Sequence, residues 1–149
     1  MRKGNNNFMS DSHLFKIARE CSLKSDYTSN CSSARVGCIT VYKGAILTKS
    51  FNSDKTHTIQ AKYNRWRYNP EECKKYLPSK IHAELGCLQR IKYLDIDFSK
   101  VHIYVYRETK DGRLAMARPC PSCMAAIRKF NIKNIHYTTD SGYCHEKLV

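Results

Sequence analysis

Apolar side chains recur at helical spacing over residues 12–24, which predicts an amphipathic first helix. Residues 36–42 and 45–51 are short runs typical of strands, and only Lys43 and Gly44 separate them. That separation has the length and composition of a tight hairpin, so we expect the two strands to pair antiparallel. The apolar positions of the helix are Leu14, Ile17, Ala18 and Cys21, with Ser10, Asp11 or Ser12 available as its cap.

The second half of the chain alternates helical and strand-like patterns. A helical face starts at Lys80, a strand follows over 101–106, another helix begins at Pro119, and a further strand covers 132–138. The strand over 45–51, the helix from Lys80 and the strand over 101–106 follow one another in the order that predicts a right-handed parallel crossover. Residues 108–117 are expected to form a turn or a small hairpin extension, and 140–149 a short fifth strand or a tail.

A polar, basic and aromatic segment at about 53–80 interrupts this pattern and is predicted to be an inserted functional loop with one helical piece near 59–68. Its composition is typical of nucleic-acid binding, in which aromatic side chains stack on bases and cations contact the phosphates. The residues expected to make these contacts are Lys55, Arg65, Trp66 and Arg67. The alternative is a covering helix whose apolar side packs inward while the charges face water. Both hold at once if Trp66 is buried and the two arginines are exposed.

Length and composition favour one domain over residues 1–149, because 42% of the 149 residues are hydrophobic and 26% are charged. The apolar runs are too short to cross a bilayer, and the N-terminus lacks the apolar region of a secretory signal. We therefore expect no membrane partner and a cytoplasmic, intracellular location.

Charge points to an anionic partner. Lysine and arginine number 26 against 13 aspartate and glutamate, a net charge of +13. Such a surplus favours single-stranded nucleic acid or a phosphorylated nucleotide as the substrate. A basic, solvated surface that only aids solubility is the alternative.

Eight cysteines in an intracellular chain are expected to be thiols or metal thiolates rather than disulfides. Cys21, Cys38 and Cys87 have apolar neighbours and are predicted to be small core residues.

Two short motifs carry the candidate chemistry. His82-Ala83-Glu84 opens one predicted helix, and Pro119-Cys120-Pro121-Ser122-Cys123 opens another. Cys120 and Cys123 are three positions apart, so both can reach one metal ion from the same helix face. The positive end of the helix dipole lowers thiol pKa values, which favours the thiolates that zinc needs.

His82 completes a three-ligand zinc site if it lies beyond the end of its helix, and Glu84 then stands beside an open fourth position. Zinc in such a site lowers the pKa of its water to about 7, and Glu84 is predicted to move the protons of a hydrolysis. A structural zinc knuckle would need a fourth protein ligand. The candidates for it are Cys144, His145, Cys73 and His57.

His-Ala-Glu followed by Pro-Cys-x-x-Cys resembles the signature of the zinc-dependent nucleoside and nucleotide deaminases. Residues 31–41 are similar to the first-strand region of deoxycytidylate deaminases, and Asn52 follows the second strand where this family places a substrate-contacting asparagine. The resemblance implies an α/β, single-domain, three-layer cytidine-deaminase-like fold, in which a mixed sheet of four or five strands has helices on both faces. It also implies substrate contacts from Asn52 and Ala83.

The chain departs from this family at 108–117 and at its end. Deoxycytidylate, transfer-RNA adenosine and polynucleotide deaminases continue into another helix and a parallel fifth strand, for which too few residues remain. Both regions border the pocket in the family fold, so the departures affect the substrate rather than the chemistry.

The sequence therefore predicts a zinc-dependent hydrolase that converts cytosine to uracil in single-stranded DNA or RNA. Free deoxycytidylate is the alternative substrate, favoured by the resemblance of residues 31–41, but its one phosphate needs only about two or three cations and leaves most of the net charge of +13 unexplained. Adenine in nucleic acid is a third possibility, and a noncatalytic, zinc-stabilised nucleic-acid-binding module is a fourth.

Overall fold

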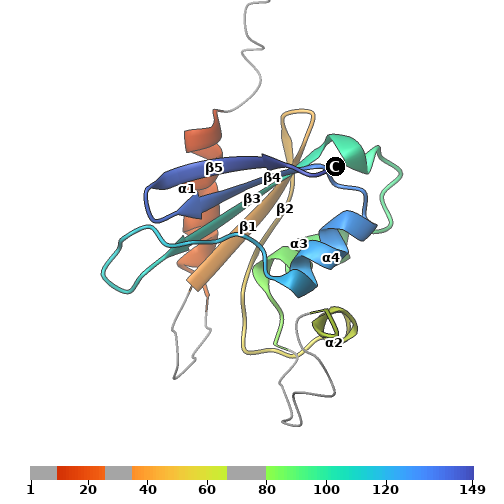
Figure 1. Cartoon of the computed structure of the whole chain (residues 1–149), viewed down its shortest axis with the longest axis horizontal. Helices are drawn as coiled ribbons and strands as arrows, with labels where there is room; N and C mark the ends of the chain where they lie inside the picture. The colour runs from red at the N-terminus through yellow and green to blue at the C-terminus, as the bar shows by residue number, and fades with distance from the viewer. Residues whose placement is uncertain (1–9, 26–34, 67–79) are drawn as a thin grey trace, which may run out of the picture.

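The computed structural model describes residues 10–25, 35–66 and 80–149, and it forms three layers around one mixed sheet (Figure 1). The strands are β1 (Arg35–Tyr42), β2 (Ala45–Phe51), β3 (Val101–Glu108), β4 (Asn134–Thr139) and β5 (Gly142–Lys147). Their order across the sheet is β2-β1-β3-β4-β5, and only β3 and β4 pair in parallel. The α/β class and the mixed sheet predicted from the sequence are confirmed.

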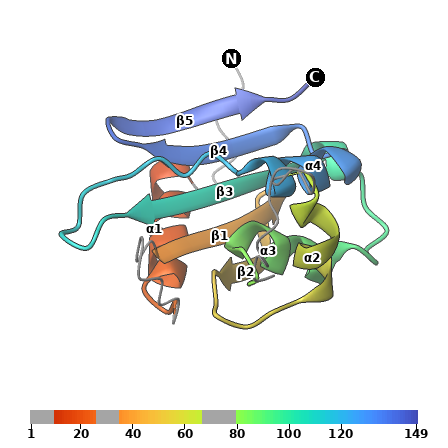
Figure 2. The ribbon, with the colours of Figure 1, turned by 60° about the horizontal axis from the view of Figure 1, so that its bottom comes forward.

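Helix α1 (Asp11–Ser22) covers one face of the sheet. Helices α2 (Thr58–Asn64), α3 (Ala83–Ile91) and α4 (Pro121–Lys129) lie on the other face (Figure 2). The predicted parallel crossover is the one through α3, which connects β2 to β3; these two strands run in the same direction, with β1 between them. Helix α4 makes a second crossover, between the hydrogen-bonded parallel strands β3 and β4.

Local chemistry explains the first three elements. The Ser10 side chain caps α1 by accepting a hydrogen bond from the backbone N–H of His13 at 3.3 Å. Lys43 and Gly44 both have positive φ, 50° and 81°, as a two-residue turn between twisted antiparallel strands requires. Gly37 of β1 lies so close beneath α1 that a Cβ atom there would be 2.0 Å from the Ala18 carbonyl oxygen.

The end of the chain is a strand rather than a tail. Strand β5 turns back directly from β4 and pairs antiparallel with it, from Thr139 opposite Gly142 to Asn134 opposite Lys147. The extension after β3 is a small hairpin, in which Glu108 bridges Leu114 and the tip at Gly112 has a φ of 85°. Both regions therefore form short structures that pair with neighbouring parts of the chain.

Apolar side chains form a core on each side of the sheet, one under α3 and α4 and a smaller one under α1. Cys21, Cys38 and Cys87 are buried free thiols within these cores, as predicted. In the part of the chain that the structure describes, no helix has the length and apolar character needed to cross a membrane.

The inserted segment differs from the prediction at Trp66. Helix α2 ends at Asn64, one turn before the predicted end at residue 68, so Trp66 lies past the helix and is 44% exposed instead of buried. Tyr63 does pack inward, and Arg65 is exposed. Arg67 lies outside the described residues.

Candidate active site

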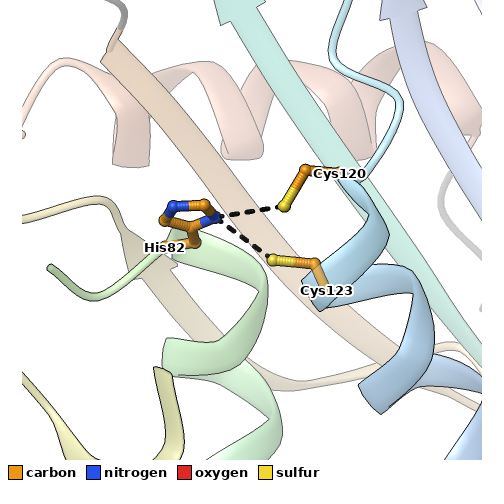
Figure 3. A group of neighbouring side chains, drawn as sticks. All are labelled: His82, Cys120 and Cys123. Carbon is orange, nitrogen blue, oxygen red and sulfur yellow. Dashed lines mark hydrogen bonds between the residues drawn. The ribbon is translucent and has the colours of Figure 1, made fainter. Parts of the chain in front are cut away.

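The N-termini of α3 and α4 meet on the same face of the sheet and bring the two motifs together (Figure 3). His82 precedes the first residue of α3, and Cys120 precedes the first residue of α4. Both have extended backbone angles, and neither side chain caps its own helix. Pro121 begins α4, where its missing N–H leaves no hydrogen bond unmade. The two side chains therefore face each other across the gap between the helices.

His82, Cys120 and Cys123 have the spacing of a zinc site. The Nδ1 atom of His82 is 3.5 Å from Cys120 Sγ and 3.3 Å from Cys123 Sγ. Zn–S bonds of about 2.3 Å and a Zn–N bond of about 2.0–2.1 Å at tetrahedral angles place sulfur and nitrogen about 3.6 Å apart. The donor set and its spacing thus fit a tetrahedral zinc ion.

Electrostatics favour a thiolate at Cys120. Hydrogen bonding from Cys123 and the nearby His82 lower the pKa of Cys120 to about 3, against the effect of burial. The Ser122 hydroxyl, 3.0 Å from Cys120 Sγ, donates to the same sulfur. Burial raises the pKa of Cys123 well above its usual range, so one of the two sulfurs is charged before the other.

Glu84 lies in the first turn of α3 and is 6% exposed. Burial raises its pKa, and the neighbouring His82 partly opposes that shift. A carboxyl group with a raised pKa can hold or release a proton near neutral pH, as an acid–base catalyst must. In the described part of the chain, the metal-binding group at this place contains His82, Cys120 and Cys123 but not Glu84. Glu84 is thus next to the site without being one of its ligands.

Gln60 of α2 is a positioning residue that the sequence analysis missed. Its side chain is fully buried, its Oε1 accepts a hydrogen bond from the His82 backbone N–H at 3.0 Å, and its Nε2 donates to Asn64 Oδ1 at 2.8 Å. This contact ties the chain before α3 to the inserted segment. A lone glutamine in a short helix carries no sequence signal for that role.

Asn52 is buried at the end of β2, where its Oδ1 accepts hydrogen bonds from the Val36 backbone N–H at 3.0 Å and from Ser25 Oγ at 2.6 Å. These bonds hold the amide in a fixed orientation beside the first strand. Ala83 is fully buried as the first residue of α3.

Lys55 is connected to the site through its backbone. Its carbonyl oxygen accepts a hydrogen bond from the Ile81 N–H at 2.9 Å, next to His82, and Thr56 bridges Lys80. The inserted segment therefore begins against the loop that carries the histidine ligand.

A groove of about 620 Å³ runs along α4, from Pro121 to Lys129, beside the end of α2. Trp66 lies at one side, with the Arg65 guanidinium stacked 3.9 Å above its ring. Arg118, Arg128 and Lys129 supply further positive charge, although Arg118 also forms a two-bond ion pair with Glu146. Pro119 and Pro121, on either side of Cys120, line the same groove, so it borders the candidate metal site.

Of the four residues considered as an additional zinc ligand, the described ones lie elsewhere. His57 Nδ1 caps α2 by accepting a hydrogen bond from the Ile59 N–H at 3.0 Å, and Cys144 and His145 belong to β5. Cys73 lies outside the described residues. The geometry therefore favours three protein ligands over a closed structural knuckle.

Comparisons with known proteins agree with this arrangement. The chain resembles a dCMP deaminase from the cyanophage S-TIM5 in its apo form, with a TM-score of 0.53 and 17% identity over 87% of this chain and 84% of that one. The same enzyme in complex with dCMP and dUMP gives the same TM-score and identity over 87% and 82%. A cytidine deaminase from Burkholderia pseudomallei gives a TM-score of 0.60 and 16% identity over 93% of both chains.

Among curated protein sequences, no match was found. At the level of sequence families, the model of the cytidine and deoxycytidylate deaminase zinc-binding region matches residues 9–139, a range that includes both motifs. The chain belongs to the cytidine and deoxycytidylate deaminase family and is a zinc-dependent hydrolytic deaminase.

Proposed function

We propose that this deaminase converts cytosine to uracil within single-stranded polynucleotide, with His82, Cys120 and Cys123 as zinc ligands and Glu84 as the catalytic acid and base. The observation that carries the polynucleotide substrate is the basic groove beside Cys120, which combines Trp66 with Arg118, Arg128 and Lys129. A base in a duplex cannot reach such a pocket, so the target base is unpaired or extruded.

Zinc with three protein ligands and an open position supplies water that is activated near neutral pH. The Glu84 carboxylate would take a proton from this water and give it to the ring nitrogen of cytosine, while the water oxygen forms a bond to the ring carbon that carries the amine. It then transfers the second proton to the departing amine, so that ammonia leaves and uracil remains. Burial of Glu84 suits both steps, because its raised pKa lets it accept and return a proton at the same pH.

Glu84→Gln tests this role. The variant keeps the three metal ligands, so it is expected to bind zinc like the wild type while losing activity by at least the roughly 10²-fold that general acid–base catalysis contributes. Zinc content by elemental analysis and uracil formation by mass spectrometry measure the two properties. A zinc-loaded Glu84→Gln protein with full activity would contradict the assignment.

Substrate contacts are proposed for Asn52 and Ala83 at the pocket, and for Lys55, Arg65, Trp66 and Arg67 along the nucleic acid. Trp66 is exposed at the groove, and a base stacked on an aromatic side chain contributes about 1–3 kcal/mol. Arg65 already stacks on the same ring and supplies a charge for phosphate. Loss of activity in Trp66→Ala on oligonucleotides, with zinc content unchanged, is the expected result.

The groove cations give a sharper test. Arg128→Gln and Lys129→Gln each remove one charge from the groove, whereas Lys16→Gln removes one from α1 on the opposite face of the sheet. Each groove variant should flatten the salt dependence of oligonucleotide binding by about 0.7 log units per log unit of salt, since that is the contribution of one phosphate contact. Lys16→Gln should leave the slope unchanged.

Free deoxycytidylate is the second candidate substrate. It is favoured by the family description and by the shared fold of the cyanophage enzyme, whose complex contains dCMP and dUMP. Turnover of free deoxycytidylate with no activity on single-stranded DNA or RNA would establish it over the polynucleotide. Adenine-containing strands belong in the same assay, because the motif serves both rings.

A further inference from the structure

Three histidines gather on the face of the sheet opposite the catalytic motifs. His102, His136 and His145 belong to β3, β4 and β5, which are neighbours in the sheet. In the sheet register His136 lies opposite both Tyr104 and His145, while His102 is two residues before Tyr104 on the same strand face. All three side chains therefore project to the side of the sheet that α1 covers.

The imidazoles are in direct contact. His102 Nδ1 is 2.8 Å from His136 Nε2, and the His136 and His145 rings stack with centroids 4.2 Å apart and planes 5° from parallel. One ring nitrogen from each of the three histidines lies within 4.8 Å of the others. Such close imidazole nitrogens are what a transition-metal site requires.

Neighbouring polar groups determine which nitrogen of two rings stays available. His145 Nε2 lies 3.0 Å from Asn134 Oδ1, an acceptor, so Nε2 carries the proton and Nδ1 is left as a donor to a metal. His136 Nδ1 lies 3.9 Å from Asp11 Oδ2, which leaves Nε2 on the side of His102. Metal-binding histidines commonly direct their second nitrogen to a carboxylate or a carbonyl oxygen in this way.

Asp11 is itself held in place. The Tyr104 hydroxyl donates a hydrogen bond to Asp11 Oδ1 at 2.6 Å, and Asp11 begins α1. Burial lowers the pKa of His102 and lowers that of His136 to about 4, so both rings are neutral at pH 7, as metal ligands must be. His145 is exposed, and His102 also lines a hollow of about 330 Å³, so an ion and a solvent ligand have access.

We propose that His102, His136 and His145 form a second metal site, separate from the catalytic one, for a divalent transition ion that prefers imidazole, such as Zn²⁺ or Cu²⁺. Metal–nitrogen bonds of about 2.0–2.1 Å at tetrahedral angles place the nitrogens about 3.3 Å apart. Metal binding therefore requires the 2.8 Å distance between His102 Nδ1 and His136 Nε2 to increase slightly. It also requires the exposed His145 ring, which stacks on His136, to rotate so that Nδ1 points to the ion. The proton that His102 Nδ1 shares with His136 moves through solvent to His102 Nε2, so that the ring stays neutral, and water takes the fourth position.

The bound ion would link β3 to β5 across β4. Strand β5 forms the edge of the sheet. On the face that α1 covers, the Tyr143 ring of β5 stacks on Phe15 of α1. A ligand that binds only the folded state stabilises it in proportion to its concentration over its dissociation constant. Occupation of this site would thus stabilise the C-terminal hairpin, independently of the deaminase reaction.

The test is a calorimetric titration of Zn²⁺ into the full-length protein already loaded with one equivalent of zinc. The wild type should bind a second equivalent, and His145→Gln should weaken that binding by about 100-fold or more, beyond the 10- to 100-fold that loss of a supporting hydrogen-bond partner costs. Because His145 is exposed, the variant should remain folded, with its deaminase activity unchanged. His13→Gln is the matched control, since His13 is exposed on α1 and lies outside the cluster.

Cu²⁺ provides an independent measurement in the same zinc-loaded protein. Its electron paramagnetic resonance spectrum should show coupling to several nitrogens, and the His102→Gln/His145→Gln double variant should lose that signal. The proposal is overturned if the wild type binds no second equivalent, or if the double variant binds it as tightly as the wild type does.

Discussion

Gly37 offers a direct test of how tightly α1 is seated on the sheet. A Cβ atom at this position would lie 2.0 Å from the Ala18 carbonyl oxygen and 2.5 Å from the Ser22 backbone nitrogen. Both obstacles are backbone atoms, so no side-chain rotation can relieve the overlap. Gly37→Ala therefore requires α1 to move away by about 1.4 Å, the difference between this distance and the 3.4 Å at which ordinary contacts begin.

The cost of that movement follows from what α1 buries. Leu14, Phe15, Ala18 and Cys21 are all at most 5% exposed beneath the helix. A gap of 0.5–1 Å already removes a quarter to a half of a contact's attraction, and each large apolar side chain contributes about 1.5–3 kcal/mol through burial. Summed over these residues, the free energy of unfolding should fall by about 3 kcal/mol, at the upper end of the usual cost of overpacking.

Urea unfolding followed by circular dichroism measures this loss. With a slope of about 2 kcal/mol/M, the midpoint should fall by about 1.5 M. Gly112→Ala is the matched control, because a Cβ atom there meets no atom within 4 Å and suffers only the strain of a φ of 85°, about 1 kcal/mol. A Gly37→Ala protein within about 0.5 kcal/mol of the wild type, the range of ordinary surface substitutions, would refute the close packing of α1.

Three further predictions concern other contacts. In Gly86→Ala the new Cβ would lie 2.1 Å from Ser50 Oγ, which can move, so urea unfolding should show a loss of about 1–2 kcal/mol in the free energy of unfolding. The second substitution Ser50→Ala should largely restore this stability. Effects of the two substitutions that simply add would contradict the predicted contact. Glu146→Gln should lower the free energy of unfolding by about 1 kcal/mol at pH 7, because it weakens the pair with Arg118. The hydrogen bonds from Arg118 lower the pKa of Glu146 from its ordinary value of 4.5, so the carboxylate stabilises the fold above that pH and loses this contribution as the pH falls further. A difference in unfolding free energy that stays constant down to acid pH would be inconsistent with that pair. Cys123→Ser removes one of the three proposed zinc ligands, so its melting temperature should match that of chelator-treated wild type, and zinc content equal to the wild type would exclude Cys123 as a ligand.

Most of the regular structure follows from local pattern. The sequence predicted the helix over residues 12–24, the hairpin at Lys43 and Gly44, and the parallel crossover through α3, because each depends on periodicity, turn chemistry or chain handedness. The motifs at residues 82–84 and 119–123 could also be recognised in the sequence, since each occupies only a few consecutive residues at the start of a helix.

The exact helix starts were harder to predict. Helix α3 begins at Ala83 rather than Lys80 because residues 80 and 81 pair with residues 55 and 56, a contact between distant parts of the chain. Trp66 was misplaced for a similar reason: apolar spacing extends past Asn64, but α2 itself does not. Strand β5 is polar at most positions, so its pairing with β4 depends on the sheet rather than on its own pattern.

The histidine cluster shows the same limit. His102, His136 and His145 are separated by 34 and 9 positions, and nothing in their local sequence brings them together. Only the order and register of β3, β4 and β5 make them neighbours.

The hairpin after β3 lies in the chain between the two motifs of the proposed zinc site. Its tip at Asp111 and Gly112 is exposed. His82 and Glu84 precede this tip in the chain, and Cys120 and Cys123 follow it. Exposed loop tips are where chains are most easily cut. A break at this tip leaves two fragments, neither of which contains a complete ligand set, so recovery of zinc-dependent turnover on mixing them would report their reassembly.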